Sequence, residues 1–177
     1  MNSQSNIPLP AKIIIGKDIL ELISSAMYVD PLTIYREYVQ NAADSIDMAR
    51  ADGVFGLDEP GRVDISIDLA QGSRSVKIRD NGSGVPNDEF AQRLTAIGGS
   101  RKRGTSARGF RGVGRLAGLG YCQELVFRSR SVGDPVVQEL RWDGRVFRRL
   151  LSDQAYQESL HDLIRDVTTM DKLDSIG

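Results

Sequence analysis

The alternation of apolar and polar residues predicts where the chain forms strands. Residues 62–69 alternate strictly, which is typical of a strand with one buried face. Residues 75–79 follow after a Gln-Gly-Ser turn, so the two segments are predicted to pair as a hairpin. Short β-branched or apolar runs predict further strands at 11–16, 121–130, 135–141 and 145–150.

Helical periodicity and helix-end signals predict the remaining elements. Asp30-Pro31 combines an N-cap residue with a proline suited to the first helical position, and the helix that follows should end near Ala51. Further helices are predicted at about 17–28, from Asn87 or Asp88 to Ala96, at 112–120 and at 153–168. This order predicts an α+β two-layer sandwich, with a mixed β-sheet covered by helices on one face, rather than a series of βαβ units.

Composition limits the classes of protein to consider. The 177 residues suffice for one domain, which is expected over 11–177 after a flexible N-terminus at 1–10. A net charge of -1 does not favour binding of polyanions by the whole surface. No apolar run approaches the roughly 20 residues of a membrane-spanning helix, and nothing resembles a signal peptide. A cytoplasmic protein without a membrane partner is therefore expected.

Cysteine and histidine usage argues against disulfides and zinc. Cys122 is the one cysteine, and its apolar and aromatic neighbours favour a buried structural thiol over a reactive one. His161 is the one histidine and has no cysteine or histidine at ligand spacing, so a zinc site is not expected.

Three polar residues share one face of the helix that ends near Ala51. Glu37, Asn41 and Asp44 are spaced by four and three residues, which places them on the same side. The solvated face of an amphipathic helix would look similar. Asparagine is a poor mid-helix residue, however, and a glutamate one turn earlier places a base beside an oxygen ligand suited to Mg²⁺. The opposite face carries Tyr35, Tyr38, Val39, Ala42 and Ile46.

The second candidate is Asp-Asn-Gly-Ser-Gly at 80–84, directly after a predicted strand. Asn-Gly is a frequent turn pair, so an ordinary turn is one interpretation. The functional interpretation assigns a role to each of Asp80, Gly82 and Gly84. Asp80 can accept a hydrogen bond from an exocyclic amine such as adenine N6, while Gly82 and Gly84 let the backbone approach a flat ligand.

The third candidate is the stretch 98–115, which contains six glycines, six basic residues and no acidic residue. Its glycines lead into a predicted helix, and backbone N–H groups at a helix start bind phosphate. A disordered basic loop is the other interpretation. The residues 112–117 also match a dinucleotide-binding pattern, but no apolar strand precedes them, so that interpretation is rejected.

Taken in order, the three candidates resemble the nucleotide motifs of the GHKL ATPases, which include DNA gyrase, the ninety-kilodalton heat-shock chaperone, sensor histidine kinases and MutL proteins. The resemblance covers about residues 10–130 and is nearest to the N-terminal domain of the chaperone. It implies the Bergerat fold, a Mg-dependent ATPase, and ATP and Mg²⁺ as bound groups. The motifs are Glu37-x-x-x-Asn41-Ala-x-Asp44, Asp80-x-Gly82-x-Gly84 and Gly109-x-x-Gly112-x-Gly114.

The resemblance also implies roles for single residues. Glu37 is the expected general base, Asn41 the expected Mg²⁺ ligand and Asp80 the expected adenine-binding carboxylate. Gly82 and Gly84 would form the wall of the adenine pocket. The backbone expected at the phosphates is that of Gly112, Val113 and Gly114. The other expected nucleotide contacts are Asp44, Val85, Ser100, Lys102, Gly109, Phe110 and Arg111.

Two departures from the chaperone pattern qualify this expectation. The segment 100–109 is short for a chaperone lid, and a Gly-Thr-x-Ile/Val strand motif is missing after residue 120. The chain is therefore expected to end before that strand and to turn over ATP weakly by itself.

The leading function is an ATPase that drives a conformational cycle in a chaperone-like protein, with client proteins as partners and a homodimer of the full-length protein. One alternative is the catalytic domain of a histidine kinase. The other is ATP-dependent DNA processing of the MutL or microrchidia type, in which the basic residues of 101–115 would contact DNA phosphates.

Overall fold

A computed structural model describes residues 32–56, 58–72, 74–96 and 114–174. The predicted flexible terminus at 1–10, the strand at 11–16 and the helix at 17–28 lie outside these ranges. The elements, in chain order, are α2 (Leu32–Ala51), β1 (Val63–Asp68), β2 (Ser75–Asp80), α3 (Phe90–Thr95), the 3-10 helix η1 (Gly114–Gly120), β3 (Glu124–Ser129), β4 (Val137–Asp143), α4 (Gly144–Ser152), α5 (Leu160–Val167) and β5 (Thr168–Leu173).

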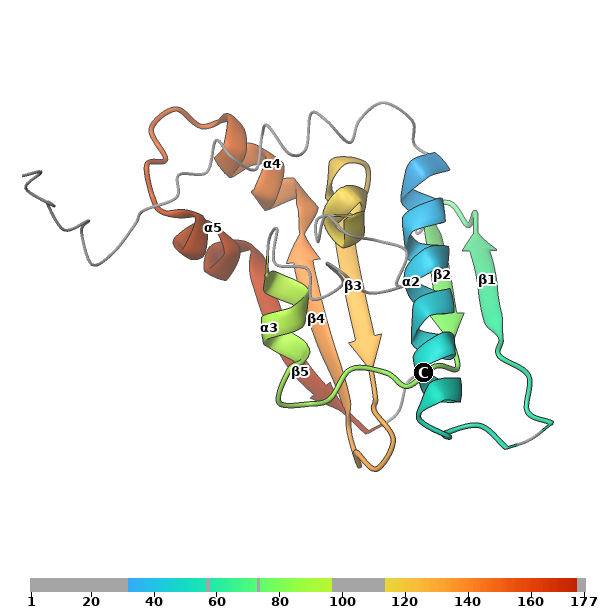
Figure 1. The fold of residues 1–177 in the computed structure, drawn as a ribbon. Helices are drawn as coiled ribbons and strands as arrows, with labels where there is room; N and C mark the ends of the chain where they lie inside the picture. The colour runs from blue at the N-terminus through green and yellow to red at the C-terminus, as the bar shows by residue number, and fades with distance from the viewer. Residues whose placement is uncertain (1–31, 57, 73, 97–113, 175–177) are drawn as a thin grey trace, which may run out of the picture.

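The described strands form two antiparallel sheets. The predicted hairpin is confirmed: β1 pairs with β2, and Val63 lies opposite Asp80. The second sheet has the order β3-β4-β5. Figure 1 shows α2 on the viewer's side of the hairpin and α3 on the viewer's side of the second sheet. The α+β class is confirmed, but every strand pair in the described ranges is antiparallel, so the parallel pairing expected of a mixed sheet is not seen there.

Helix α2 packs through a narrow row of small and branched side chains against β2, β1 and η1. The fully packed positions recur at helical spacing, as an amphipathic helix requires. Tyr35 was expected on this face, but its side chain is 42% exposed, so that expectation is wrong. The buried apolar residues of α2 are Ile34, Ala42, Ile46 and Ala49.

The main hydrophobic core is centred on β4 and on the helices that follow it. Trp142 and Phe147 are both buried and meet edge to face, with ring centroids 6.5 Å apart and an angle of 86° between the rings. This arrangement suits the aromatic quadrupoles. The cluster comprises Phe90, Leu119, Leu140, Trp142, Phe147, Leu163 and Val167.

The strand predicted at 145–150 is wrong, because these residues belong to α4. The Asp143 carboxylate caps the helix by accepting the backbone N–H groups of Arg145 and Val146, each at 2.9 Å. These bonds favour the ionised form and hold the pKa of Asp143 below its usual range. The sequence analysis predicted a strand from the short apolar run at 145–150 and did not use Asp143 as an N-cap.

Two other helix boundaries also need correction. The helix predicted at 153–168 begins only at Leu160, because Ser159 accepts the Asp162 N–H and donates its hydroxyl to the Asp162 carboxylate. Its last predicted residue, Thr168, already belongs to β5. For α3, the N-cap residue is Glu89, which makes no side-chain capping hydrogen bond, so capping by Asn87 or Asp88 is wrong.

Within the described ranges, no helix combines the length and the apolar character needed to cross a membrane. Cys122 is half-buried, and burial raises the pKa of its thiol, which agrees with a structural rather than a reactive cysteine.

Candidate functional site

Helix α2 places the three polar candidates of the first motif at different depths. The Glu37 side chain is 25% exposed and lies 3.7 Å from Arg36. Asn41 is half-buried, whereas only 8% of Asp44 is exposed. Because Glu37 and Asn41 are one helical turn apart, they present a carboxylate and an amide oxygen along the same side of α2.

The second motif folds directly onto this helix. The Asp80 carboxylate accepts the Gly82 backbone N–H at 3.0 Å, which closes a tight turn at the end of β2. The next amide, that of Ser83, donates to the Ser45 carbonyl of α2 at 3.2 Å. Ser45 lies one turn after Asn41, so the first two motifs are in contact through the backbone.

Both glycines of this motif are required by the packing of the protein itself. A Cβ atom on Gly82 would clash with Ser45, including its backbone. Gly84 has a φ of +69°, and a Cβ there would clash with the carbonyl of Arg130. The sequence suggested that these glycines let a ligand approach the backbone. The structure shows another reason for a glycine at each position: Gly82 lies close to α2, and Gly84 lies close to the end of β3.

Asn81 is a residue of this loop whose role the sequence analysis missed. Its side-chain oxygen accepts the Arg62 N–H at 2.7 Å, and its amide donates to the Pro60 carbonyl at 3.1 Å. Asn81 therefore fixes the entry to β1 against the end of β2. The Asn-Gly pair was read only as a turn signal, which does not reveal such a long-range contact. Farther along, the Val85 N–H donates to the Ser129 hydroxyl at 2.7 Å and fixes the loop to β3.

Most of the third motif, together with Ser100 and Lys102, lies outside the described residues; only Gly114, at the start of η1, is included. The residues after it are held by Tyr38 of α2. The Tyr38 hydroxyl donates to the Arg115 carbonyl at 2.9 Å and accepts the Gly118 N–H at 3.2 Å. The sequence placed Tyr38 on the packed face, but the spacing alone did not predict these hydrogen bonds.

The surroundings of Tyr38 keep its hydroxyl protonated. Burial is the largest cause and raises the pKa of Tyr38 far above its usual value. A protonated hydroxyl can donate and accept at once, as both bonds require. Burial also lowers the pKa of the neighbouring Arg115, whose guanidinium donates to the Ala96 carbonyl at the end of α3.

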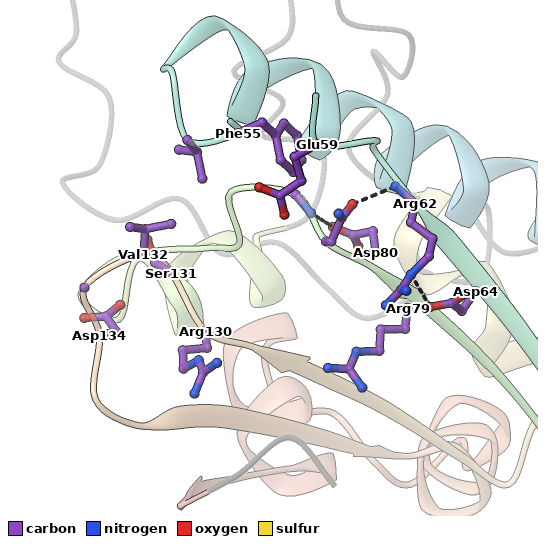
Figure 2. Close-up of a pocket in the computed structure, with 14 residues that line it drawn as sticks. Phe55, Glu59, Arg62, Asp64, Arg79, Asp80, Arg130, Ser131, Val132 and Asp134 are labelled. Carbon is purple, nitrogen blue, oxygen red and sulfur yellow. Dashed lines mark hydrogen bonds and ion pairs between the residues drawn. The ribbon is translucent and has the colours of Figure 1, made fainter. Parts of the chain in front are cut away.

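A pocket of about 430 Å³ opens beside the second motif. Figure 2 shows Asp80 on one side, with Arg62, Asp64 and Arg79 from the hairpin beside it. Asp80 and Gly82 line this pocket, whereas Glu37 and Asn41 do not. The pocket therefore brings together only part of the predicted site. The rest of its wall comes from Val54, Phe55, Glu59, Asn81 and the β3–β4 turn at 130–134.

The described residues contain no group of three or more aspartate, glutamate, histidine or cysteine side chains that could enclose a metal ion. This excludes an all-protein metal cage within the described ranges. It is compatible with Mg²⁺ held by one or two side chains together with phosphate oxygens and water. Glu37 and Asn41 provide oxygen atoms of the required kind.

Comparison with known proteins identifies the class. Residues 33–170 match the family described as "Histidine kinase-, DNA gyrase B-, and HSP90-like ATPase", and the chain belongs to this family. The GHKL resemblance seen in the motifs is thereby confirmed.

Individual relatives share between 26% and 28% of their aligned residues with this chain. The "Chaperone protein HtpG" of Polaromonas naphthalenivorans is 28% identical over 141 residues, which is 70% of this chain and 22% of the relative. The proteins of the same name from Burkholderia lata and Bordetella parapertussis are 28% and 26% identical, over 72% of this chain and 22% of each relative. The chain thus spans about a fifth of the length of these chaperones.

Proposed function

We propose that this domain binds Mg-ATP and hydrolyses it within a chaperone-like protein of the heat-shock class. The observation that carries the proposal is that α2 contacts both the loop after β2 and η1. This helix bears Glu37 and Asn41, its Ser45 carbonyl holds the loop after Asp80, and its Tyr38 holds η1. The loop after β2 and η1 thus both contact α2, and the family match supports a nucleotide site beside this helix.

The predicted site residues that lie within the described ranges have the following proposed roles. Asp80 accepts the exocyclic amine of adenine, while its bond to Gly82 fixes the direction of the carboxylate. Glu37 orients the attacking water and accepts its proton, as a general base. Asn41 provides an oxygen for Mg²⁺, which neutralises phosphate charge when bound. Asp44 and Val85 are proposed to shape the nucleotide pocket from α2 and from the loop.

The pairing of Glu37 with Arg36 does not compete strongly with the proposed role. Their atoms are 3.7 Å apart, and the arginine side chain is 66% exposed. Exposed pairs of this kind contribute little to stability, so the carboxylate can turn toward a water molecule at small cost.

The test is calorimetric titration of the 177-residue chain with ATP, with and without Mg²⁺, and with adenosine. Binding of ATP that strengthens with Mg²⁺, together with weaker binding of adenosine, supports the proposal. A parallel titration with duplex DNA separates the DNA-processing alternative. Absence of nucleotide binding by the folded chain would refute the proposed function.

Client proteins, a homodimer of the full-length protein and a cytoplasmic location stay predictions. Analytical ultracentrifugation of the full-length protein with and without nucleotide tests the dimer, because a nucleotide-driven chaperone cycle should shift the association equilibrium.

A further inference from the structure

The hydroxyl of Tyr38 joins two elements that are distant in the sequence. Tyr38 follows Glu37 in the sequence of α2, and the partners of its hydroxyl, Arg115 and Gly118, are 77 and 80 residues away along the chain. The phenol is largely buried, so an unbonded hydroxyl there would be costly. Both hydrogen-bonding functions of the oxygen are used on the backbone of η1.

The same connection extends to a third element through Arg115. Its carbonyl is held by Tyr38, while its guanidinium donates to the Ala96 carbonyl at the C-cap of α3. The position of Arg115 therefore links α2, η1 and the end of α3. A phenylalanine at position 38 would fill nearly the same volume but would supply neither bond.

Gly118 makes the contact with Tyr38 possible. A Cβ atom at this position would lie 2.6 Å from the Tyr38 hydroxyl oxygen and 3.3 Å from the end of the Leu125 side chain. The hydroxyl is therefore the main obstacle to a side chain at position 118. Without that oxygen, the nearest of the remaining neighbours named for a new methyl group is the flexible Leu125 terminus, at 3.3 Å.

We propose that Tyr38 is a positioning residue for nucleotide phosphates: its hydroxyl sets the place of η1 relative to Glu37 and Asn41. The inference rests on the proposed ATP-binding function and adds a residue to it. Tyr38 does not contact the reacting atoms in this arrangement. It acts through the backbone of Arg115 and Gly118, so its loss should affect the phosphate-dependent part of binding and spare the adenosine-dependent part.

The experiment compares four variants of the 177-residue chain with the parent. They are Tyr38→Phe, Gly118→Ala, the double variant and Tyr35→Phe, a matched control on the same helix whose side chain is exposed. Calorimetry measures the affinities for adenosine and for a non-hydrolysable ATP analogue with Mg²⁺. Thermal unfolding measures the Tm of each variant.

We expect Tyr38→Phe to weaken binding of the ATP analogue about 10-fold, the scale set by losing buried hydrogen bonds. Binding of adenosine should remain at the parental level, and Tyr35→Phe should match the parent in both. Gly118→Ala should lower the Tm in the parent but much less in the background of Tyr38→Phe, because the clash is gone. The double variant should nevertheless keep the weakened ATP-analogue binding, which separates packing from positioning.

Equal losses of adenosine and ATP-analogue binding in Tyr38→Phe would show a merely structural role and overturn the inference, as would parental binding of both ligands. Failure of the parent itself to bind the ATP analogue would instead refute the proposed function. The two failures are thus distinguishable.

Discussion

The backbone amide of Ser83 donates a hydrogen bond to the carbonyl of Ser45, one helical turn after Asn41 in α2. This hydrogen bond holds the loop after β2 against the helix that carries the proposed catalytic base, Glu37. Tyr38, two turns earlier on the same helix, holds η1 by its hydroxyl. A single helix therefore supports two separate segments of the proposed site, and changes along it should affect nucleotide binding in distinguishable ways.

Asp80→Asn should remove most ATP affinity while preserving the fold. The asparagine oxygen can still accept the Gly82 N–H, so the turn should survive. Its other group is an amide NH2, which only donates and cannot accept the hydrogen bond from the adenine amine. Calorimetry with ATP measures the effect. Asp52→Asn, an exposed carboxylate that does not line the pocket, is the control and should bind as the parent does; ATP affinity at the parental level in Asp80→Asn would disprove the adenine assignment.

Glu37→Ala should keep ATP binding and slow hydrolysis by something on the order of 10²–10⁴-fold, the usual contribution of a positioned general base. The measurement is steady-state phosphate release by the full-length protein, with binding checked separately. Asp47→Asn is a matched control because this carboxylate is on the same helix but 56% exposed and paired with Arg50. Hydrolysis by Glu37→Ala at the parental rate would exclude Glu37 as the base.

Asn41→Ala should weaken nucleotide binding only when Mg²⁺ is present. The amide oxygen is the expected protein ligand of the ion, whereas adenosine binding does not require the ion. Titrations with ATP in Mg²⁺ and in EDTA provide the comparison. A loss of equal size under both conditions would show that Asn41 supports the pocket rather than the metal.

Gly84→Ala should destabilise the fold more than Gly133→Ala. Both glycines have positive φ, +69° and +87°, so each alanine bears a backbone strain of about 1–2 kcal/mol. Only at Gly84 does the new Cβ also clash with the Arg130 carbonyl, because nothing lies within 4 Å of the corresponding atom at Gly133. The free energy of unfolding from urea titration should fall by at least about 1 kcal/mol more in Gly84→Ala. Equal losses would mean that the loop relaxes away from β3.

Glu139 should stabilise the fold in a pH-dependent way. Burial alone would raise the pKa of this carboxylate, but hydrogen bonds from Arg128 at 2.6 Å and Arg141 at 2.5 Å outweigh burial and lower it. The stabilisation is therefore present above the unfolded pKa of about 4.3 and is lost as the pH falls through the lower folded pKa. Glu139→Gln should destabilise the protein at pH 7, by about 1–3 kcal/mol.

The difference in free energy of unfolding between parent and Glu139→Gln should shrink as the solution is taken from pH 7 to pH 3. Glu124→Gln is the control, because this carboxylate pairs with Arg141 at 2.9 Å but is 54% exposed, and exposed pairs contribute little. A difference that is constant over the whole pH range would show that the charge of Glu139 is not the source of its contribution.

Two elements that depend on interactions between neighbouring residues were predicted correctly, whereas one that depends on a long-range contact was not. The helix from Asp30-Pro31 to Ala51 and the hairpin at 62–79 were predicted because periodicity and turn residues act locally. The segment 145–150 was predicted as a strand from its short apolar run, but it is helical and is capped by Asp143. β5 was missed because pairing with β4, a contact across about 30 residues, determines its conformation.

The sequence by itself determined the ATPase family and the order of its motifs, since short spacings on one helix or in one turn are properties of neighbouring residues. Tertiary structure alone decided that Gly82 rests on Ser45, that Gly84 rests on Arg130 and that Tyr38 holds η1. These contacts join positions that are 37 to 80 residues apart, and no local pattern encodes them. They exist because close packing forces buried polar groups to find partners in whichever segment the fold brings within reach.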